Sequence, residues 1–320
     1  MYINVIIPVY NSERYLTKCI TSVQEQSYVY WRIYAVDDGS KDSSGEILDH
    51  FAENDNRIDV YHIENHGAGY ARNYALSKLS NDDGYVVFID SDDYIEKDFF
   101  KCLASHKEDV VFIDVLQKNG RDSIIREEKM SIYSCKSKDS ILRKQMTGNI
   151  PWGGCRKSYR TKLLLENCIK YSEHTVGEEA IFSFKALYFA NSIGFINKAV
   201  YTYHIHDGSL STLKIDDPWG PVVENLKSEI KDMDLYMEFA NTVNAFEISA
   251  ACVSLRRLAL YYKYGEYRKR ARERINKLLD LYDFSQRLDL KSLRKEAILL
   301  MPFVRLKMYG LIYLACRIRG

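Results

Sequence analysis

Short apolar runs alternate with amphipathic stretches through about the first third of this 320-residue chain. The apolar runs cover residues 2–9, 33–36, 58–63, 85–89 and 110–115. Their length and β-branched content predict buried strands, and apolar residues three or four positions apart, such as Leu16, Ile20 and Val23, predict helices between them. Repeated strand–helix–strand units of this spacing predict an α/β fold, with a mostly parallel sheet flanked by helices.

Clusters of unusual residues follow four of the predicted strands. The clusters are Pro8 with Tyr10, Asp37 with Asp38, the glycine-bearing segment 65–72, and Asp90 with Ser91 and Asp92. Pro8 is expected to end its strand because proline has no backbone N–H for the ladder. Ligands bind beyond the carboxyl ends of parallel strands, so we expect these clusters to form one binding site.

The segment FIDSDDY, residues 88–94, places three carboxylates directly after an apolar run. These carboxylates would repel one another strongly unless something neutralised them. A divalent cation is suited to this task, because Mg²⁺ and Mn²⁺ prefer oxygen ligands and are often shared with substrate phosphates. The alternative interpretation is a solvated turn. In both interpretations, Asp93 is expected to cap the next helix.

The composition, with 46% hydrophobic and 28% charged residues, is typical of a soluble globular protein. Seven cysteines without a CxxC pair indicate free thiols in a reducing compartment rather than disulfides or a zinc site. Met1 leads directly into an apolar strand-like run, and no apolar stretch has the length of a membrane span. We therefore expect a cytoplasmic protein.

Four segments, IIPVYNSERYL, VDDGSKDSS, ENHGAGYARN and FIDSDDY, occur in an order and spacing that closely resemble the family 2 glycosyltransferases of GT-A fold. The resemblance is strong over residues 1–115. It continues more weakly through WGGCRKSYR at 152–160, GEEAIF at 177–182 and YTYHIHDGSLS at 201–211. It implies inverting transfer of a sugar from a nucleotide-sugar, commonly a UDP-sugar, to a hydroxyl of a glycan or lipid-linked acceptor in bacterial surface polysaccharide synthesis.

The resemblance also implies roles for the residues at the strand ends. The nucleotide-sugar contacts that it assigns are Pro8, Tyr10, Asp37, Asp38, Asn65, Arg72, Asp90, Ser91 and Asp92. Asp90 and Asp92 would hold Mn²⁺ or Mg²⁺ against the donor diphosphate. His204 would be a third metal ligand or a phosphate contact, with His206 as the alternative. Asp37 has the alternative role of holding its own loop.

Residues 116–215 would form the acceptor half of the enzyme. In the family motif usually written GED, this chain has Gly177, Glu178 and Glu179, so Glu replaces the usual Asp. The resemblance implies that Glu179 is the general base, with Glu178 as the fallback; the alternative is that both merely favour a helix start. Trp152 would stack on the acceptor sugar, or belong to the core. Lys157 matches the lysine of the family's K-x-Y stretch.

The domain organisation expected on this basis is a GT-A domain over residues 1–215, with the donor half at 1–115, followed by a helical region at 216–320. Residues 255–320 carry 17 Lys and Arg against 6 Asp and Glu. Basic residues interspersed with apolar blocks predict helices lying on an anionic membrane surface, peripherally on the inner face of the cell membrane. The alternative is an ordinary helical subdomain.

Other classes fit the sequence less well. No GK[ST] motif is present and no GxGxxG follows the first strand, which disfavours an NTPase or a dinucleotide-binding enzyme. No nucleic-acid-binding motif accompanies the basic tail, so nucleic acid is not an expected partner. A nucleotidyltransferase and a non-catalytic scaffold or sugar-nucleotide-binding protein remain as alternatives.

Overall fold

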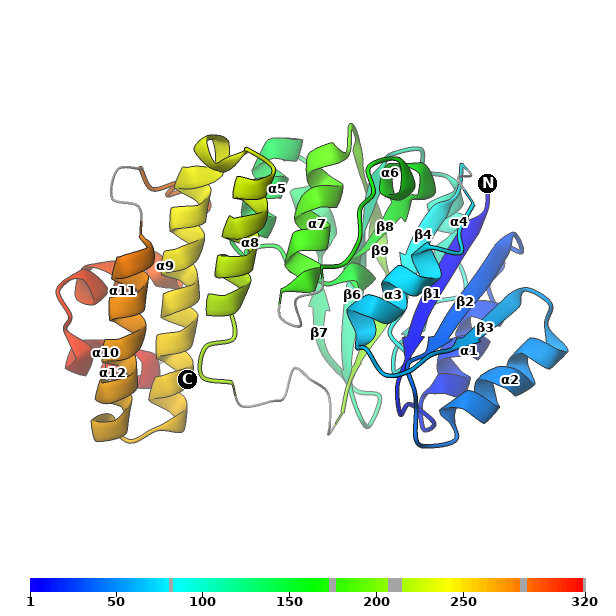
Figure 1. Ribbon diagram of the computed structural model, residues 1–320, viewed down its shortest axis with the longest axis horizontal. Coiled ribbons are helices and arrows are strands. Elements are labelled where there is room, and N and C mark those ends of the chain that lie inside the picture. Colours follow the sequence, from blue (N-terminus) through cyan, green and yellow to red (C-terminus); the bar gives the residue numbers. More distant parts are fainter. Residues whose placement is uncertain (81–82, 173–176, 207–214, 283–286, 319–320) are drawn as a thin grey trace. The chain divides into compact units, whose positions relative to one another are not determined.

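The computed structural model describes residues 1–80, 83–172, 177–206, 215–282 and 287–318. The chain divides into two compact units (Figure 1). The first consists of Met1–Lys138 and Trp152–Thr212, and the second of Asp139–Pro151 and Leu213–Gly320. Each unit is described by itself below.

The described strands of the first unit form one sheet in the order β3–β2–β1–β4–β8–β6–β9–β5, with β7 paired to β6. The strands are β1 (Ile3–Val9), β2 (Trp31–Asp37), β3 (Ile58–His62), β4 (Tyr85–Phe88), β5 (Tyr94–Ile95), β6 (Val110–Asn119), β7 (Ile124–Glu128), β8 (Lys157–Arg160) and β9 (Ile193–Ile205). The strands β3, β2, β1 and β4 are parallel, as are β6 and β9. The predicted α/β fold is confirmed, and β8 makes the sheet mixed by running antiparallel between β4 and β6.

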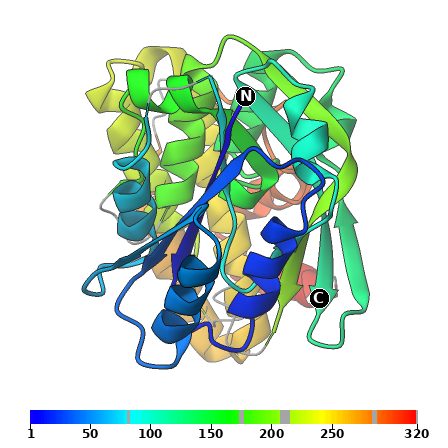
Figure 2. The same cartoon turned by 90° about the vertical axis from the view of Figure 1, so that its right-hand side faces the viewer.

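The first three helices lie on both faces of the parallel strands. They are α1 (Leu16–Gln24), α2 (Ser44–Asn54) and α3 (Ala68–Leu76). The chain moves from β1 to β2 to β3 in one direction, and then returns past them to β4. Because such crossovers are right-handed, this reversal puts α3 on the face opposite α1 and α2, as Figure 2 shows. Ligands in such sheets bind where the strand order reverses, which here is between β1 and β4.

Pro8 does not end the first strand, contrary to expectation. It lies inside β1 in register with Val36, and pairing with β2 continues to Val9 and Asp37. On the other side, pairing of β1 with β4 stops at Ile6 and Phe88. Proline lacks an N–H for the ladder on one side only, so the strand persists through its partner on the other.

The remaining elements of the first unit complete the sheet and carry its later loops. They are α4 (Phe99–Ala104), α6 (Thr161–Glu166), α7 (Glu178–Phe189) and the short 3₁₀ helices η1 (Met130–Tyr133) and η2 (Gly154–Arg156). The core is built on β1, of which all seven residues are buried. Continuous burial on both faces explains why the apolar runs do not alternate with polar residues.

The second unit is helical. Its helices are α5 (Lys138–Met146, from Asp139 on), α8 (Gly220–Asp232), α9 (Tyr236–Tyr261), α10 (Tyr264–Leu281), α11 (Lys295–Arg305) and α12 (Tyr309–Ile318). The other helices pack around α9, and residues 139–151 join them through hydrogen bonds from Arg143 to Thr242 (2.9 Å) and from Asn149 to the carbonyl of Ser292 (2.6 Å). Among the described helices, none combines the length and apolar content needed to cross a bilayer.

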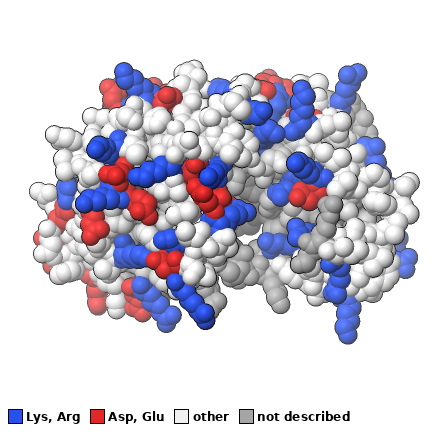
Figure 3. Space-filling model, turned by 180° about the vertical axis from the view of Figure 1, so that it is seen from behind, with Lys and Arg blue, Asp and Glu red and all other residues white. Residues whose placement is uncertain are grey.

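Basic side chains predominate on the face of the helical unit that Figure 3 shows. Figure 3 shows many Lys and Arg and few Asp and Glu on the side of that view occupied by the C-terminal helices, whereas both signs are interleaved over the first unit. This agrees with the excess of Lys and Arg in residues 255–320. An anionic surface would be attracted to such a charge distribution.

Candidate active site

The loop after β2 is held to the glycine-bearing loop that enters α3. The buried Asp38 carboxylate accepts hydrogen bonds from the backbone N–H groups of His66 and Gly67, both at 2.8 Å. The Asn65 side chain donates to the Asp38 carbonyl at 2.9 Å. Gly67 has φ +92°, a conformation that favours glycine. Asp38 and Asn65 therefore fix the two loops to each other.

Asp37 holds its own loop, which was the alternative expected for it. Its carboxylate accepts hydrogen bonds from the Ser40 N–H (3.0 Å) and contacts His62 Nδ1 (3.0 Å). Burial raises the pKa of Asp37, but the hydrogen bonds from Ser40 and His62 outweigh burial and lower it. The pKa of His62 is raised by its hydrogen bonds to Asp37 and Asp49. This end of β2 is thus a rigid, charge-paired turn.

The loop after β1 reaches the carboxylate cluster after β4. Ser12 and Ser91 share a hydrogen bond of 2.6 Å between their hydroxyls, both buried. Asn11 has φ +49° and donates its N–H to Ser40 Oγ. Tyr10 is 50% exposed beside them. The ends of β1, β2 and β4, separated in sequence, therefore meet at one edge of the sheet.

Each of the three clustered carboxylates has a different partner. Asp90 accepts a 2.7 Å hydrogen bond from Arg72 Nη2, and Asp92 contacts His206 Nε2 at 2.9 Å. The pKa of Asp92 is raised by burial and then by the neighbouring charge of Asp90. Repulsion between these carboxylates is thus only partly neutralised by the protein.

Asp93 does not cap a helix, contrary to expectation. The next helix, α4, begins at Phe99 with Asp98 at its N-cap position. Asp93 is buried and accepts hydrogen bonds from the Tyr201 hydroxyl (2.6 Å) and the His204 N–H (2.8 Å). Burial, and then the charges of Asp90 and Asp92, raise its pKa. It ties the cluster to β9.

The structure brings His206, rather than His204, to the carboxylates. The His206 ring stacks on Tyr15 at 4.4 Å between centroids, whereas His204 meets Tyr15 edge-on at 5.4 Å. The His206 ring contacts the Asp92 carboxylate, whereas His204 reaches the cluster only through its backbone N–H, which donates to Asp93. The two serines of the 201–211 segment, Ser209 and Ser211, lie outside the described residues.

Two carboxylates and one imidazole are donors that suit Mn²⁺ or Mg²⁺ when substrate phosphates supply the remaining ligands. In the parts of the chain that the structure describes, no group of three or more His, Cys, Asp or Glu is arranged to hold a metal by itself.

The glutamate pair lies next to the glycine-bearing loop. Glu178 and Glu179 begin α7, after Gly177 at φ +87°. A Cβ added at Gly69 would lie 3.5 Å from Glu178 Cγ, so the N-terminus of α3 packs against this pair. Burial raises the pKa of Glu178. Glu179 accepts a long hydrogen bond of 3.4 Å from the Gly154 N–H.

Arg72 lies between the two groups of carboxylates. Burial opposes its charge, but Tyr171, Asp90 and Glu179 together raise its pKa above the usual range. Its Nε is buried and has no hydrogen-bond partner among the described residues. The Arg72 guanidinium lies 5.1 Å from the ring centroid of Tyr171. Arg72 is therefore a permanent cation in contact with the strand-end cluster, and the charge of Glu179 also stabilises it.

Trp152 is half-buried, and its backbone carbonyl accepts two side-chain hydrogen bonds. The Lys157 ammonium and the Ser183 hydroxyl both donate to the Trp152 carbonyl at 2.7 Å. Lys157 is 1% exposed, and burial, with repulsion from Arg156, lowers its pKa to about 7. Glu179 opposes this shift electrostatically. The loop at 152–154 is thus attached to both β8 and α7.

Two further residues near the site have no expected role from the sequence. Arg156 makes a paired salt bridge to Glu128 of β7, with Nε and Nη2 each 2.7 Å from Oε2. Tyr201 donates to Asp93 and accepts from the Asp90 N–H. The chain has 25 tyrosines, so no sequence signal distinguishes Tyr201. Arg156 thus joins η2 to β7, and Tyr201 joins β9 to the loop that follows β4.

Parallel sheets with such a strand reversal occur in several classes of ligand-binding proteins, and comparison with known proteins identifies the class to which this one belongs. Residues 4–163 match the model of glycosyl transferase family 2, and the chain belongs to this family. The glycosyltransferase GlyA of Streptococcus pneumoniae is 32% identical over 65% of this chain, and GlyG of the same organism is 28% identical over 72%. The chain spans 31% of the length of GlyA and 80% of GlyG.

Solved structures show the same fold. The crystal structure of Staphylococcus aureus TarS 1–349 in complex with UDP-GlcNAc superposes with a TM-score of 0.66 at 24% identity, over 98% of this chain and 90% of that one. TarS is named a poly(ribitol-phosphate) β-N-acetylglucosaminyltransferase, and this chain spans 35% of its full length. The resemblance to the GT-A glycosyltransferases is therefore confirmed at the level of family and fold.

Proposed function

We propose that this chain transfers a sugar from a UDP-sugar to a hydroxyl of a glycan or lipid-linked acceptor, with inversion at the anomeric carbon and with Mn²⁺ or Mg²⁺. The observation that carries this proposal is Arg72, which contacts Asp90 of the strand-end cluster at 2.7 Å and whose charge is stabilised electrostatically by Glu179 of α7. The transfer needs groups that bind the donor diphosphate on one side of the anomeric carbon and a base for the acceptor hydroxyl on the other. Asp90 and Arg72 would serve the donor side, and Glu179 the acceptor side.

The donor side would work by neutralising charge. The leaving nucleoside diphosphate gains negative charge as the glycosidic bond breaks. A divalent metal held by Asp90 and Asp92, with His206 or His204 beside them, would supply Lewis-acid stabilisation of that charge. Arg72 would add a fixed cation and hydrogen-bond donors, since its Nε has no protein partner among the described residues.

Base recognition would fall to Pro8, Tyr10 and the loops that Asp37, Asp38 and Asn65 fix. Both Asp38 carboxylate oxygens already accept backbone hydrogen bonds. We therefore assign Asp38 mainly to shaping the base site, and Tyr10, half-exposed, to contact with the base. The UDP-bound structures of TarS support uracil as the base. Ser91, tied to Ser12, would lie near the ribose.

The acceptor side would consist of Glu179, Glu178 and Trp152. In an inverting transfer, one carboxylate takes the proton of the acceptor hydroxyl while that oxygen attacks the anomeric carbon. Glu179 would be this base, and Trp152 would stack on the acceptor sugar. The name of TarS, a poly(ribitol-phosphate) β-N-acetylglucosaminyltransferase, supports a polymeric acceptor, and the proposed task is one step in building a bacterial surface polysaccharide, such as capsule, exopolysaccharide or lipopolysaccharide.

A panel of nucleotide-sugars tests the proposal directly. The full chain is incubated with each donor and Mn²⁺, Mg²⁺ or EDTA, and release of the nucleoside diphosphate is measured without an acceptor. Slow, metal-dependent release of UDP from one donor is expected, because water can replace the acceptor. Metal-independent release, or release from none of the UDP-sugars together with no UDP binding, would contradict it.

Lys157 gives a prediction about pH. Its pKa is about 7 in the fold against an ordinary value near 10.4, so the unfolded chain binds more protons between these values. Stability from this residue therefore rises with pH from about 7 to 10, by up to about 1.4 kcal/mol per pH unit. Urea unfolding at pH 7 and 9 should show a gain for wild type that Lys157→Met lacks.

The matched control for this experiment is Lys101→Met, which removes an exposed lysine of α4. Its stability should change with pH as that of the wild type does. If Lys157→Met also follows the wild type, Lys157 does not titrate in this range, and its contact with Trp152 is simply a charged hydrogen bond.

The helical unit would bring the enzyme to its acceptor at the inner face of the cell membrane. We expect sedimentation with vesicles that contain anionic lipid and little binding to neutral vesicles. Added salt should weaken binding, because exposed charges are screened beyond roughly 10 Å at 0.1 M. Equal recovery in the supernatant with anionic and neutral vesicles at low salt would refute attachment.

A further inference from the structure

The loop at 152–154 is held by more contacts than its hydrogen-bonding groups require. The Trp152 carbonyl accepts a hydrogen bond from the Ser183 hydroxyl at 2.7 Å. The Lys157 ammonium is a second donor to the same oxygen, also at 2.7 Å. One hydrogen bond satisfies most buried carbonyls in proteins. Ser183 already supplies it, so the contact from Lys157 needs another explanation.

This second donor lowers the stability of the fold. Lys157 is 1% exposed, and burial, followed by repulsion from Arg156, lowers its pKa to about 7. An apolar side chain of similar length would avoid the desolvation of the ammonium, and such replacements are often neutral or stabilising. It would also leave the Trp152 carbonyl bonded to Ser183. Groups that reduce stability in this way are typical of functional sites.

The two glycines of the loop lie directly against fixed side chains. A Cβ added at Gly153 would lie 2.6 Å from Arg156 Nη1, and one added at Gly154 would lie 3.0 Å from the Tyr171 hydroxyl. Arg156 cannot easily withdraw, because its Nε and Nη2 both contact Glu128 Oε2 at 2.7 Å. The loop therefore packs through its bare backbone, with little room to move towards these side chains.

The same loop connects two residues of the proposed acceptor side. Trp152 lies at its start, and at its end the Gly154 N–H donates to Glu179 Oε1 at 3.4 Å. This distance is at the upper end for an N–H···O hydrogen bond, so a small displacement of the loop would break the contact. The position of the loop therefore acts on Glu179 directly.

We propose that Lys157 is a positioning residue of the transfer reaction: by holding the Trp152 carbonyl, it keeps the loop where Gly154 orients Glu179. This deepens the proposed function and rests on it, because it assumes that Glu179 takes the proton of the attacking hydroxyl. A misplacement of about 1 Å can reduce an enzymatic rate by roughly 10²-fold. A buried ammonium that fixes this loop is therefore useful to catalysis despite its effect on stability.

Slow release of UDP tests the proposal without an acceptor, since water then supplies the attacking hydroxyl. The full chain is assayed with the UDP-sugar panel and Mn²⁺. Lys157→Met removes the ammonium but keeps an unbranched side chain, and it should reduce kcat for UDP release about tenfold or more. KM for the UDP-sugar and the affinity for UDP should not change. An unchanged kcat would refute the positioning role.

The common acceptor atom gives a second test. Ser183→Ala leaves Lys157 on the Trp152 carbonyl, and Lys157→Met leaves Ser183 on it. The double variant leaves neither, so its loss in kcat should exceed the product of the two separate losses. Losses that simply multiply would show that the two side chains act independently, and would contradict a role through this carbonyl.

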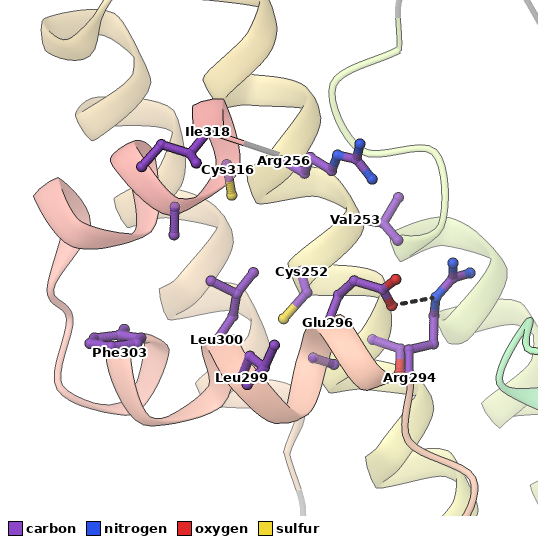
Figure 4. Close-up of a pocket in the computed structure, with 13 residues that line it drawn as sticks. Cys252, Val253, Arg256, Arg294, Glu296, Leu299, Leu300, Phe303, Cys316 and Ile318 are labelled. Atoms are coloured by element: carbon purple, nitrogen blue, oxygen red, sulfur yellow. Dashed lines mark ion pairs between the residues drawn. The ribbon is translucent and has the colours of Figure 1, made fainter. Parts of the chain in front are cut away.

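Fluorine NMR of the chain labelled with 5-fluorotryptophan separates positioning from general destabilisation. The chain has three tryptophans, so two serve as references. Trp31 is buried in β2, and the ring of Trp219 lies 5.1 Å from Arg294, which lines the apolar cavity of the helical unit (Figure 4). Lys157→Met should shift or split the Trp152 resonance alone. An unchanged Trp152 resonance, or equal changes in all three, would refute the proposal.

Two further variants complete the experiment. Lys101→Met, which removes an exposed lysine of α4, should change neither the rate nor the resonances. Glu179→Gln separates this inference from the proposed function. If it reduces UDP release and Lys157→Met does not, only the positioning role is refuted. If it leaves release unchanged, the proposed base is refuted, whereas the Trp152 resonance still shows whether Lys157 holds the loop.

Discussion

Replacing Glu179 by Gln is expected to reduce sugar transfer by about 10²–10⁴-fold while UDP-sugar binding persists. A positioned general base contributes about this much to an enzymatic rate. Gln keeps the size of the side chain and can keep a polar contact with the Gly154 N–H, but it cannot take a proton from the acceptor hydroxyl. The measurement is kcat with the true acceptor, together with donor affinity by calorimetry.

The structure provides a neighbour as the control. Glu178 precedes Glu179 in the first turn of α7, is buried enough to have a raised pKa, and packs against Gly69. Glu178→Gln should therefore affect the packing of the loop more than the chemistry. Glu179→Asp should retain part of the activity, because it keeps the carboxylate but shortens its reach. If only Glu178→Gln impairs transfer, Glu178 rather than Glu179 is the base. If neither variant impairs transfer, the base is another residue.

The Glu179 variants should fold with nearly the stability of the wild type. Glu179 acts on Arg72 and Lys157 through its charge, so removing it should disfavour their protonated forms. Arg72 keeps its 2.7 Å contact with Asp90, which limits the loss. Unfolding in urea should therefore show at most a modest change, and lost transfer can be read as lost chemistry.

The local sequence pattern was sufficient to predict the strands of the parallel part of the sheet. Continuous apolar runs marked β1 and β4 because both faces of these strands are buried. The carboxyl ends of parallel strands necessarily share one edge, so Asp38, Asn65 and Asp90 could be placed together without knowing any contact. The antiparallel insertion of β8 between β4 and β6 had no comparable signal.

Contacts between distant segments were the part that could not be predicted. The sequence indicated that Asp38 and Asp93 follow strand ends. It did not indicate that Asp38 would bind the backbone at 66–67, or that Asp93 would accept a hydrogen bond from the Tyr201 hydroxyl. Such partners are selected by geometry that forms only when the sheet is assembled. The same reason explains residues 139–151, which group with helices that begin about 70 residues later.

The choice between two histidines illustrates the same limit. His204 and His206 both follow the β9 pattern, and residues two apart on a strand point to the same face. Sequence alone therefore could not separate them. In the structure the His206 ring contacts Asp92, whereas the backbone N–H of His204 donates a hydrogen bond to Asp93.

Replacing Asp92 by Asn should abolish the stimulation of UDP binding by Mn²⁺. Asn keeps the size of the side chain and its contact with His206, but it removes one of the two negative charges proposed to hold the metal. We expect calorimetry to show that Mn²⁺ strengthens UDP binding to the wild type relative to EDTA, and that this difference disappears in the variant. His206→Ala should likewise weaken the stimulation by Mn²⁺.

The fold should tolerate this change, which makes the result interpretable. The charge of Asp90 already raises the pKa of Asp92, and both charges raise that of Asp93. Removing one carboxylate from three relieves repulsion, so Asp92→Asn should be at least as stable as the wild type. Asp98→Ala, at the exposed N-cap of α4, is the control that should leave metal stimulation intact. Equal UDP affinity of the wild type with EDTA and with Mn²⁺ would show that Asp90 and Asp92 serve the donor without a metal.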